Sequence, residues 1–254
     1  MKICDGNKAC SDIAYFFSEI SSIYPITPSS PMASNIDALS HNKLNLFGAP
    51  VKLIEMQSEA GAAGTLHGAL ISGSLASTFT ASQGLLLMIP NMYKIAGEML
   101  PGVIHVAART VATNALSIFG DHSDIYATRS TGFAILASTN VCDAENLAAV
   151  AHLSAIKGSI PFLHFFDGFR TSHEISSIQE LPEEKLKELI PWDAIDEFKK
   201  KSLNVGSGIQ KGMAMNEDIF FQTQEARNPN YNSLPDIVND YMESINKIMG
   251  TSYK

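Results

Sequence analysis

Apolar residues recur along the chain in two patterns that alternate, one with the spacing of a helix and one in short continuous runs. Helical spacing over residues 8–19 predicts a first helix, which the serines at positions 21 and 22 would end. Runs rich in β-formers predict later strands, over residues 51–56, 75–81, 102–108, 133–138 and 160–166. Helical patterns lie between these runs, over residues 59–72, 86–99 and 144–157. The alternation predicts an α/β fold with a doubly wound parallel sheet, covered by helices on both faces.

The pattern loses this regularity beyond residue 178. A charged stretch, a Gly-Ser-Gly break at 206–208 and an irregular run come first, and Ser233 is then expected to cap a final helix. We therefore predict a core over residues 1–178 and a C-terminal extension over residues 179–250 that packs on this core.

The composition and the net charge argue against several classes of partner and cofactor. The 254 residues carry a net charge of −8, and nucleic acid or an anionic membrane would require a basic surface, so neither is an expected partner. The longest apolar run, residues 85–90, is too short to span a bilayer, and we expect a cytoplasmic protein. Cys4, Cys10 and Cys142 form no CxxC motif, so we expect no iron–sulfur cluster and no other metal ligands on this chain.

Polar residues follow the predicted strands at one edge of the sheet. Right-handed crossovers bring every strand-to-helix loop to that edge, where such sheets bind ligands. The polar groups expected there are Glu59, Ser82 with Gln83, Arg109, and the loop 167–170. Gly61, Gly64 and Gly68 lie on one side of the Glu59 helix, either for packing or for the close approach of a flat ring.

A stiff loop precedes these elements. Residues 23–31, IYPITPSSP, carry a proline at every third position, and each proline fixes its own φ near about −65° and extends the residue before it. Thr27 is held between two of these prolines, and Ser30 with Pro31 predicts a helix start shortly after it. The pattern alone describes either a rigid connection or a hydroxyl held in position.

Five blocks of sequence stand out, in this order. They are YPITPSS at 24–30, EMQSEAGAAG at 55–64, FTASQGLLLMIP at 79–90, SIFGDHSD at 117–124 and HFFDGFRTSHE at 164–174. Together they closely resemble the pyruvate:ferredoxin (flavodoxin) oxidoreductase family, over the whole chain, and correspond to the N-terminal domain of a much larger enzyme. The resemblance implies the pyrimidine-type thiamine-diphosphate-binding fold, and it makes residues 251–254 the start of a linker to a next domain.

The resemblance also implies an activity, the oxidative decarboxylation of pyruvate to acetyl-CoA and CO₂ with transfer of electrons to ferredoxin or flavodoxin. This domain would bind the pyrimidine end of thiamine diphosphate. Further domains of the full enzyme, an expected homodimer, would supply the diphosphate site, Mg²⁺, [4Fe-4S] clusters and the coenzyme A site. The usual Gly-Asp-Gly diphosphate motif is missing here, since Gly120-Asp121-His122 lacks its second glycine. A different 2-oxoacid as substrate, or a truncated docking module without activity, are the alternatives.

Three residues receive roles from the resemblance. Glu59 would hydrogen-bond N1′ of the aminopyrimidine and favour its imino tautomer, while Arg109 and the Thr27 hydroxyl would bind the pyruvate carboxylate. The alternative for Glu59 is a carboxylate that only complements a helix dipole, and Glu55 is its competitor inside the strand.

The roles of other residues near this edge are left open by the sequence. Arg129 and Arg170 are charged like Arg109, but we carry the anion-binding role to neither. His122 and Asp124 either line the cavity or bond to each other as a loop clasp. A charged loop could form a domain contact or a lid, and it contains Asp167, Arg170, His173 and Glu174. Two histidines are expected to be buried or half-buried with partners, His67 and His105.

Overall fold

The computed structural model describes residues 1–203, 205–206 and 212–254, so most of the predicted Gly-Ser-Gly break lies outside the described residues. A six-stranded sheet forms the centre, with the strand order β3-β2-β4-β5-β7-β6. Every neighbouring pair in this sheet is parallel. The strands are β2 (Ile20–Ile23), β3 (Lys52–Glu55), β4 (Ala76–Thr80), β5 (Val103–Ala108), β6 (Ala134–Ala137) and β7 (Phe162–Asp167).

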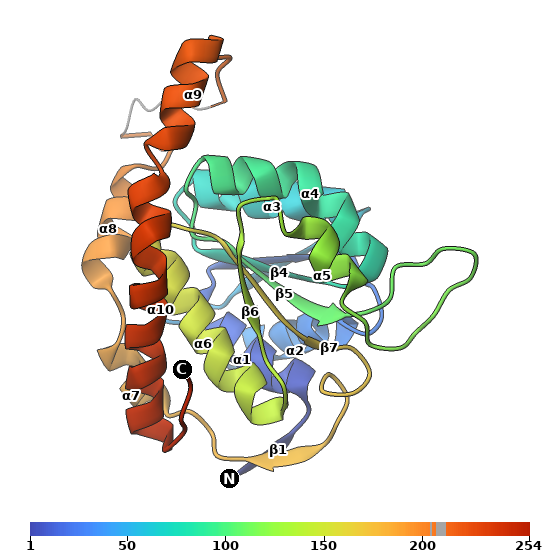
Figure 1. Cartoon of the computed structure of the whole chain (residues 1–254). Coiled ribbons are helices and arrows are strands. Elements are labelled where there is room, and N and C mark those ends of the chain that lie inside the picture. The colour runs from blue at the N-terminus through green and yellow to red at the C-terminus, as the bar shows by residue number, and fades with distance from the viewer. Residues whose placement is uncertain (204, 207–211) are drawn as a thin grey trace.

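Helices cover both faces of the sheet (Figure 1). One face carries α1 (Gly6–Phe17), α2 (Ser30–Ser40) and α6 (Val141–Gly158), with α1 packed against the other two. The opposite face carries α3 (Glu59–Ile71), α4 (Ser82–Gly97) and α5 (Ser123–Thr128), with α4 packed between its neighbours. This arrangement confirms the predicted doubly wound α/β fold. Nowhere in the described part of the chain is a helix both long enough and apolar enough to cross a bilayer.

The central strand β2 is absent from the sequence-based prediction, which took its serines as the end of the first helix. The helix ends at Phe17, and β2 pairs with β3 on one side and β4 on the other. Both serines are buried, and their hydroxyls bond within the sheet region: Ser21 Oγ lies 3.1 Å from Ser77 Oγ, and Ser22 Oγ donates to the Ala62 carbonyl at 2.9 Å. Local polarity therefore concealed a buried strand.

Two boundaries also differ from the prediction. Ser82, Gln83 and Gly84 were expected in a loop but form the first turn of α4. The last helix, α10 (Asn228–Met249), begins before Ser233, since the Asn228-Pro229 pair places a proline in its first turn, where no backbone N–H is needed. A further helix, α9 (Glu217–Glu225), lies where an irregular run was expected.

The C-terminal part of the chain packs beside α6. It contains α7 (Glu183–Glu188), α8 (Trp192–Lys200) and α10, which runs along α6. Leu186, Ile195 and Ile245 from these helices join the apolar core beneath α1 and α6. The Tyr253 hydroxyl donates to Asp143 at 2.8 Å, so the last residues also lie against α6. The division of the chain at residues 178 and 250 stays a prediction.

The two ends of the predicted core meet in a separate small sheet. Strand β1 (Lys2–Cys4) pairs antiparallel with β8 (Ser176–Ile178). Lys2 also reaches two buried or half-buried carboxylates, Asp12 at 2.6 Å and Glu145 at 2.9 Å. These contacts hold the N-terminal residues against α1 and α6.

Replacement of Leu66 by Ala tests the core between α3 and α4. Leu66 is fully buried in the cluster on that face, so Leu66→Ala should lower the free energy of unfolding by about 2–5 kcal/mol. The matched control is Leu87→Ala on α4, where the side chain is 52% exposed and the expected change is within about 0.5 kcal/mol. Urea denaturation followed by circular dichroism measures both, and equal losses would contradict this description of the core.

Candidate functional site

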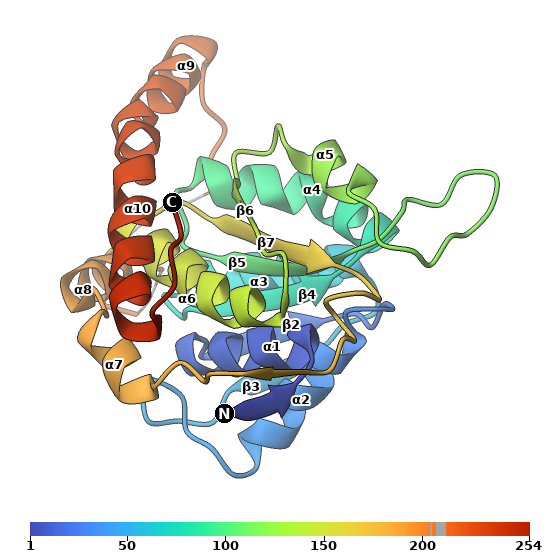
Figure 2. The same ribbon diagram turned by 60° about the horizontal axis from the view of Figure 1, so that its bottom comes forward.

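The loops that follow the strands gather at the carboxyl edge of the sheet, as expected for this fold. The segment between β5 and α5 projects from this edge as a long loop (Figure 2). A shallow hollow of about 570 Å³ opens beside it, lined by residues 120–123, Tyr126 and Asp167. A larger hollow of about 860 Å³ lies against α9 and α10 and includes none of the predicted site residues. The candidate site is therefore built from the loops themselves.

Glu59 opens helix α3 at this edge. Ser58 is extended and its side chain accepts a hydrogen bond from the Gly61 N–H at 3.1 Å, which starts the helix and places Glu59 in its first turn. The Glu59 side chain is only 6% exposed. Among the described residues, no group donates a hydrogen bond to its carboxylate. A carboxylate that is nearly buried at the ligand-binding edge and keeps its capacity to accept hydrogen bonds is a candidate binding group.

The first turn of α4 lies directly against this carboxylate. A Cβ atom at Gly84 would lie 2.7 Å from Glu59 Oε1 and 2.5 Å from Thr80 Oγ1, so only glycine fits there. The Thr80 hydroxyl is itself buried and has no hydrogen-bond partner in the described part of the chain. A carboxylate and a hydroxyl that can still accept or donate hydrogen bonds thus lie together beside a glycine.

Arg109 follows β5 and is 7% exposed. Its Nη1 donates to the Thr27 carbonyl at 2.6 Å and its Nη2 to Gln83 Oε1 at 3.1 Å. Its Nε is buried and has no partner among the residues that the structure describes. Burial lowers the pKa of Arg109, and the negative charges of Asp124 and Glu59 oppose that shift. Arg109 and Glu59 therefore belong to one electrostatic site.

Thr27 meets Arg109 through its backbone carbonyl, and the role of its hydroxyl toward a substrate stays a prediction. The Thr27 side chain is exposed, and its peptide bond to Pro28 is cis. Asn7, fully buried on α1, donates to the Pro28 carbonyl at 2.9 Å. A Cβ atom at Gly168 would lie 2.8 Å from Pro28 Cγ, so the loop after β7 touches the proline loop closely. The roles of Asn7 and Gly168 had no signal in the sequence beyond their residue types.

Asp124 ties the neighbouring loops together. Its fully buried carboxylate accepts hydrogen bonds from the backbone N–H groups of Ser82 at 2.8 Å, Arg109 at 3.1 Å and Ile125 at 2.8 Å. Burial raises the pKa of Asp124, and these backbone hydrogen bonds oppose the shift. The suggested clasp between His122 and Asp124 is wrong, because His122 Nε2 instead pairs with Asp167 Oδ1 at 2.8 Å.

The other candidates lie apart from this site. Glu55 is exposed at the end of β3, and Arg129 and Arg170 are exposed, with Arg129 bonded to the nearby Tyr126 carbonyl. In the charged loop, His173 bonds to Ser172 at 2.7 Å.

The expectation for the two histidines is confirmed: His67 is buried beside Glu98, and His105 is buried with polar partners. A Cβ atom at Gly64 or Gly68 would meet no atom within 4 Å, so packing inside this chain does not require either glycine.

Comparison with known proteins identifies the family of this chain. The model of a family described as "Pyruvate flavodoxin/ferredoxin oxidoreductase, thiamine diP-bdg" matches residues 13–243. The chain belongs to this family. Its relatives in the family include the pyruvate-flavodoxin oxidoreductase of Klebsiella pneumoniae, 58% identical over 254 residues, which are 100% of this chain and 22% of that protein. The pyruvate:ferredoxin oxidoreductase of Moorella thermoacetica is 55% identical over 250 residues, or 98% of this chain and 21% of that protein.

A solved structure shows the same fold. The 2-oxoglutarate:ferredoxin oxidoreductase from Magnetococcus marinus, determined with 2-oxoglutarate, coenzyme A and succinyl-CoA bound, matches with a TM-score of 0.68. The match covers 92% of this chain and 45% of that one at 19% sequence identity, so it carries the fold alone. The family model describes a thiamine-diphosphate-binding domain, and the solved structure supports the α/β fold of this chain.

Replacement of Asp124 by Asn tests its role in holding the loops. One acceptor oxygen becomes an NH₂ group that faces backbone N–H donors, so Asp124→Asn should cost about 1–3 kcal/mol of stability. Amide hydrogen exchange at Ser82 and Arg109 should also become faster. Asp121→Asn is the control, since Asp121 is exposed and bonds only to the adjacent Ser123 among the described residues. Unchanged exchange at both amides in Asp124→Asn would show that other contacts hold these loops.

Proposed function

We propose that this chain forms the part of a pyruvate:ferredoxin or pyruvate:flavodoxin oxidoreductase that binds the aminopyrimidine of thiamine diphosphate and the 2-oxoacid. The reaction would be the oxidative decarboxylation of pyruvate to acetyl-CoA and CO₂. The chain spans about a fifth of the length of the relatives it matches, 22% and 21% in the two cases above, so the activity is that of a longer protein. The observation that carries the proposal is the nearly buried Glu59 carboxylate in a member of this family, which lies beside Gly84 and has no donor among the described residues.

The residues at the edge of the sheet fit the cofactor. Thiamine diphosphate, when bound, supplies a nucleophilic carbon and an electron sink for the decarboxylation of a 2-oxoacid. Glu59 would accept a hydrogen bond from a protonated ring nitrogen and hold that proton in place, a role for which a carboxylate with no competing donor is suited. Gly84 would keep the space beside the carboxylate free of a side chain. No diphosphate or Mg²⁺ ligand is proposed on this chain.

Arg109 would bind the carboxylate of the substrate. Two of its nitrogens already donate to Thr27 and Gln83, which fixes the plane of the guanidinium group. Its buried Nε–H and the second hydrogens of Nη1 and Nη2 are left for an anion, and a guanidinium fork matches a carboxylate in shape and charge. The exposed Thr27 hydroxyl would add one further donor next to it. This arrangement orients a small substrate without covalent contact.

Further features of the whole enzyme stay predictions. Arg109 and Thr27 would contact only the part common to all 2-oxoacids, so a panel of 2-oxoacids in steady-state assays decides between pyruvate and its analogues. The [4Fe-4S] clusters, Mg²⁺, the coenzyme A site and the homodimer would come with the remaining domains. Ferredoxin or flavodoxin as acceptor, and the cytoplasmic location, likewise rest on the resemblance and on the names of the relatives.

Glu59→Gln tests the cofactor role. The amide can still form a hydrogen bond but cannot hold the proton as a carboxylate does, so kcat of the complete enzyme should fall by about 10²–10⁴-fold. The fold, followed by circular dichroism, should not change. Glu55→Gln is the matched control, because Glu55 is exposed on β3, and its turnover should equal that of the wild type. Pyruvate decarboxylation at the wild-type rate in Glu59→Gln would remove Glu59 from the reaction.

Arg109→Ala and Thr27→Ala test the substrate role. A charge-assisted hydrogen bond is worth about 1.5–3 kcal/mol and a neutral one about half as much, so Arg109→Ala should lower kcat/KM for pyruvate about tenfold more than Thr27→Ala. Arg109→Lys keeps the charge but loses the fork and should fall between them. Cofactor affinity, measured by calorimetry, should change little in all three. If Arg109→Ala instead abolishes cofactor binding, or if pyruvate kinetics are unchanged in both alanine variants, these residues do not form the substrate site.

A further inference from the structure

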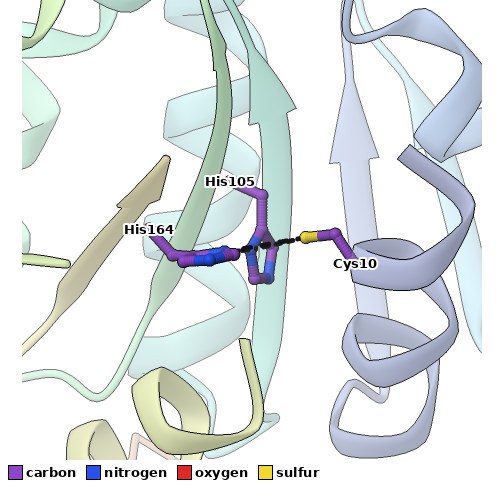
Figure 3. Close-up of side chains that lie close together, drawn as sticks. All are labelled: Cys10, His105 and His164. Atoms are coloured by element: carbon purple, nitrogen blue, oxygen red, sulfur yellow. Dashed lines mark hydrogen bonds between the residues drawn. The ribbon is translucent and has the colours of Figure 1, made fainter. Parts of the chain in front are cut away.

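Three buried side chains converge beneath the sheet, on the face covered by α1 and α6. Cys10 comes from α1, His105 from β5 and His164 from β7, and all three are fully buried (Figure 3). Cys10 Sγ lies 3.1 Å from His105 Nδ1 and 3.7 Å from His164 Nδ1, and the two Nδ1 atoms are 3.0 Å apart. His105 and His164 are direct partners in the parallel register of β5 and β7, so both rings lie on the same face of the sheet.

The spacing of these atoms is that of a metal site. Zinc binds cysteine sulfur at about 2.3 Å and histidine nitrogen at about 2.0–2.1 Å, so the ligand atoms of a tetrahedral site lie about 3.3–3.6 Å apart. The three separations of 3.0, 3.1 and 3.7 Å are within about 0.5 Å of that range. Thiolate and imidazole groups also bind zinc in preference to the hard cations Mg²⁺ and Ca²⁺.

The outer nitrogen of each histidine has a partner, as in metal sites. His164 Nε2 lies 2.7 Å from Ser138 Oγ, and that hydroxyl also donates to the Asp143 carbonyl at 3.0 Å, which leaves its oxygen to accept the His164 Nε2–H. His105 Nε2 lies 3.1 Å from His152 Nε2. Histidines that bind a metal through one nitrogen commonly donate the other N–H to such a partner, which fixes the ring.

One choice of tautomers leaves two nitrogen lone pairs facing each other. If both outer nitrogens carry the hydrogen, His105 Nδ1 and His164 Nδ1 meet at 3.0 Å with only the Cys10 thiol nearby. Two lone pairs at this distance repel unless a positive charge lies between them. A cluster without metal would instead need a hydrogen on one Nδ1 atom, and the experiment below separates the two arrangements.

We propose that Cys10, His105 and His164 bind one divalent transition-metal ion of the zinc class. On binding, the S–H bond of Cys10 breaks, a sulfur–metal bond forms and the proton passes to solvent, while both imidazoles bind as neutral rings. A tetrahedral ion would take its fourth ligand, such as a water molecule, from outside these three residues. The sequence led us to expect no metal ligands here, because its cysteines form no CxxC motif, and Cys10 is 95 residues from His105 along the chain.

Such an ion would be structural. It would join α1 to strands β5 and β7, because His105 lies within β5, the strand directly before Arg109, and His164 lies within β7. The site lies on the α1 face, whereas Glu59 starts a helix on the opposite face (Figure 1). The proposal therefore does not depend on the proposed function.

Metal analysis of the 254-residue chain tests the proposal. The chain is produced without an affinity tag in medium supplemented with zinc, dialysed against EDTA while folded, and analysed by plasma mass spectrometry. We expect about one zinc ion per chain, retained during dialysis because the site is enclosed and released on unfolding. Production with cobalt should give the visible bands of tetrahedral Co²⁺ and a thiolate-to-cobalt charge-transfer band in the near ultraviolet. Folded wild-type chain with less than a tenth of one zinc ion, and without these bands, would overturn the proposal.

Variants assign the ion to this cluster. Cys10→Ser should lose at least nine tenths of the zinc and the charge-transfer band. The matched control is Cys142→Ser, which changes a thiol elsewhere and should keep both. His152→Gln should weaken zinc binding by about 10–100-fold, because it alters the partner of His105 Nε2. If Cys10→Ser keeps as much zinc as Cys142→Ser, the ion lies elsewhere and the proposal fails. If Cys10→Ser does not fold, the zinc content and cobalt spectrum of the wild type decide.

Discussion

Strand β5 is the constraint on which the rest of the molecule depends. All of its residues are buried, and it is hydrogen-bonded to parallel strands on both sides, β4 and β7. Its register against these neighbours places His105 opposite both Phe79 and His164, and its end determines where Arg109 leaves the sheet. A shift of one residue would exchange the two faces of the strand and remove both the buried histidine and the arginine from their partners.

Burial of charge is the second feature of the structure. Glu59, Arg109 and Asp124 are all nearly or fully buried at the carboxyl edge, where ionised groups are costly unless they are paired or hydrogen-bonded. Asp124 accepts hydrogen bonds from three backbone N–H groups, and Arg109 donates to a carbonyl and an amide oxygen, while its buried Nε has no partner among the described residues. Glu59 has no such partner among the described residues, so its carboxylate keeps its capacity to accept hydrogen bonds at this edge.

Polar groups also recur inside the sheet, away from this edge. Ser21 and Ser22 bond inside β2 and its neighbours, and the histidines beneath β5 and β7 bond to one another and to Ser138. Each of these groups has its partner on a different element, which makes the partners informative about strand order. Such networks favour one arrangement of the strands over others, because a shifted strand would leave buried polar atoms unpaired.

Much of the fold follows from local patterns. Apolar runs and helical spacing identify five of the six strands of the central sheet, and Ser58 before Glu59 marks the start of α3 because a serine cap acts within one turn. The edge at which Glu59, Gln83 and Arg109 gather follows from the handedness of the crossovers alone. In contrast, the serines of β2 predict the end of a helix, because the sequence does not show that their hydroxyls bond to partners on β4 and α3. The bonds of Asp124 and the meeting of Cys10, His105 and His164 join residues far apart in the chain. Only the order and register of the strands bring such residues together, since no local pattern records a contact made across the sheet.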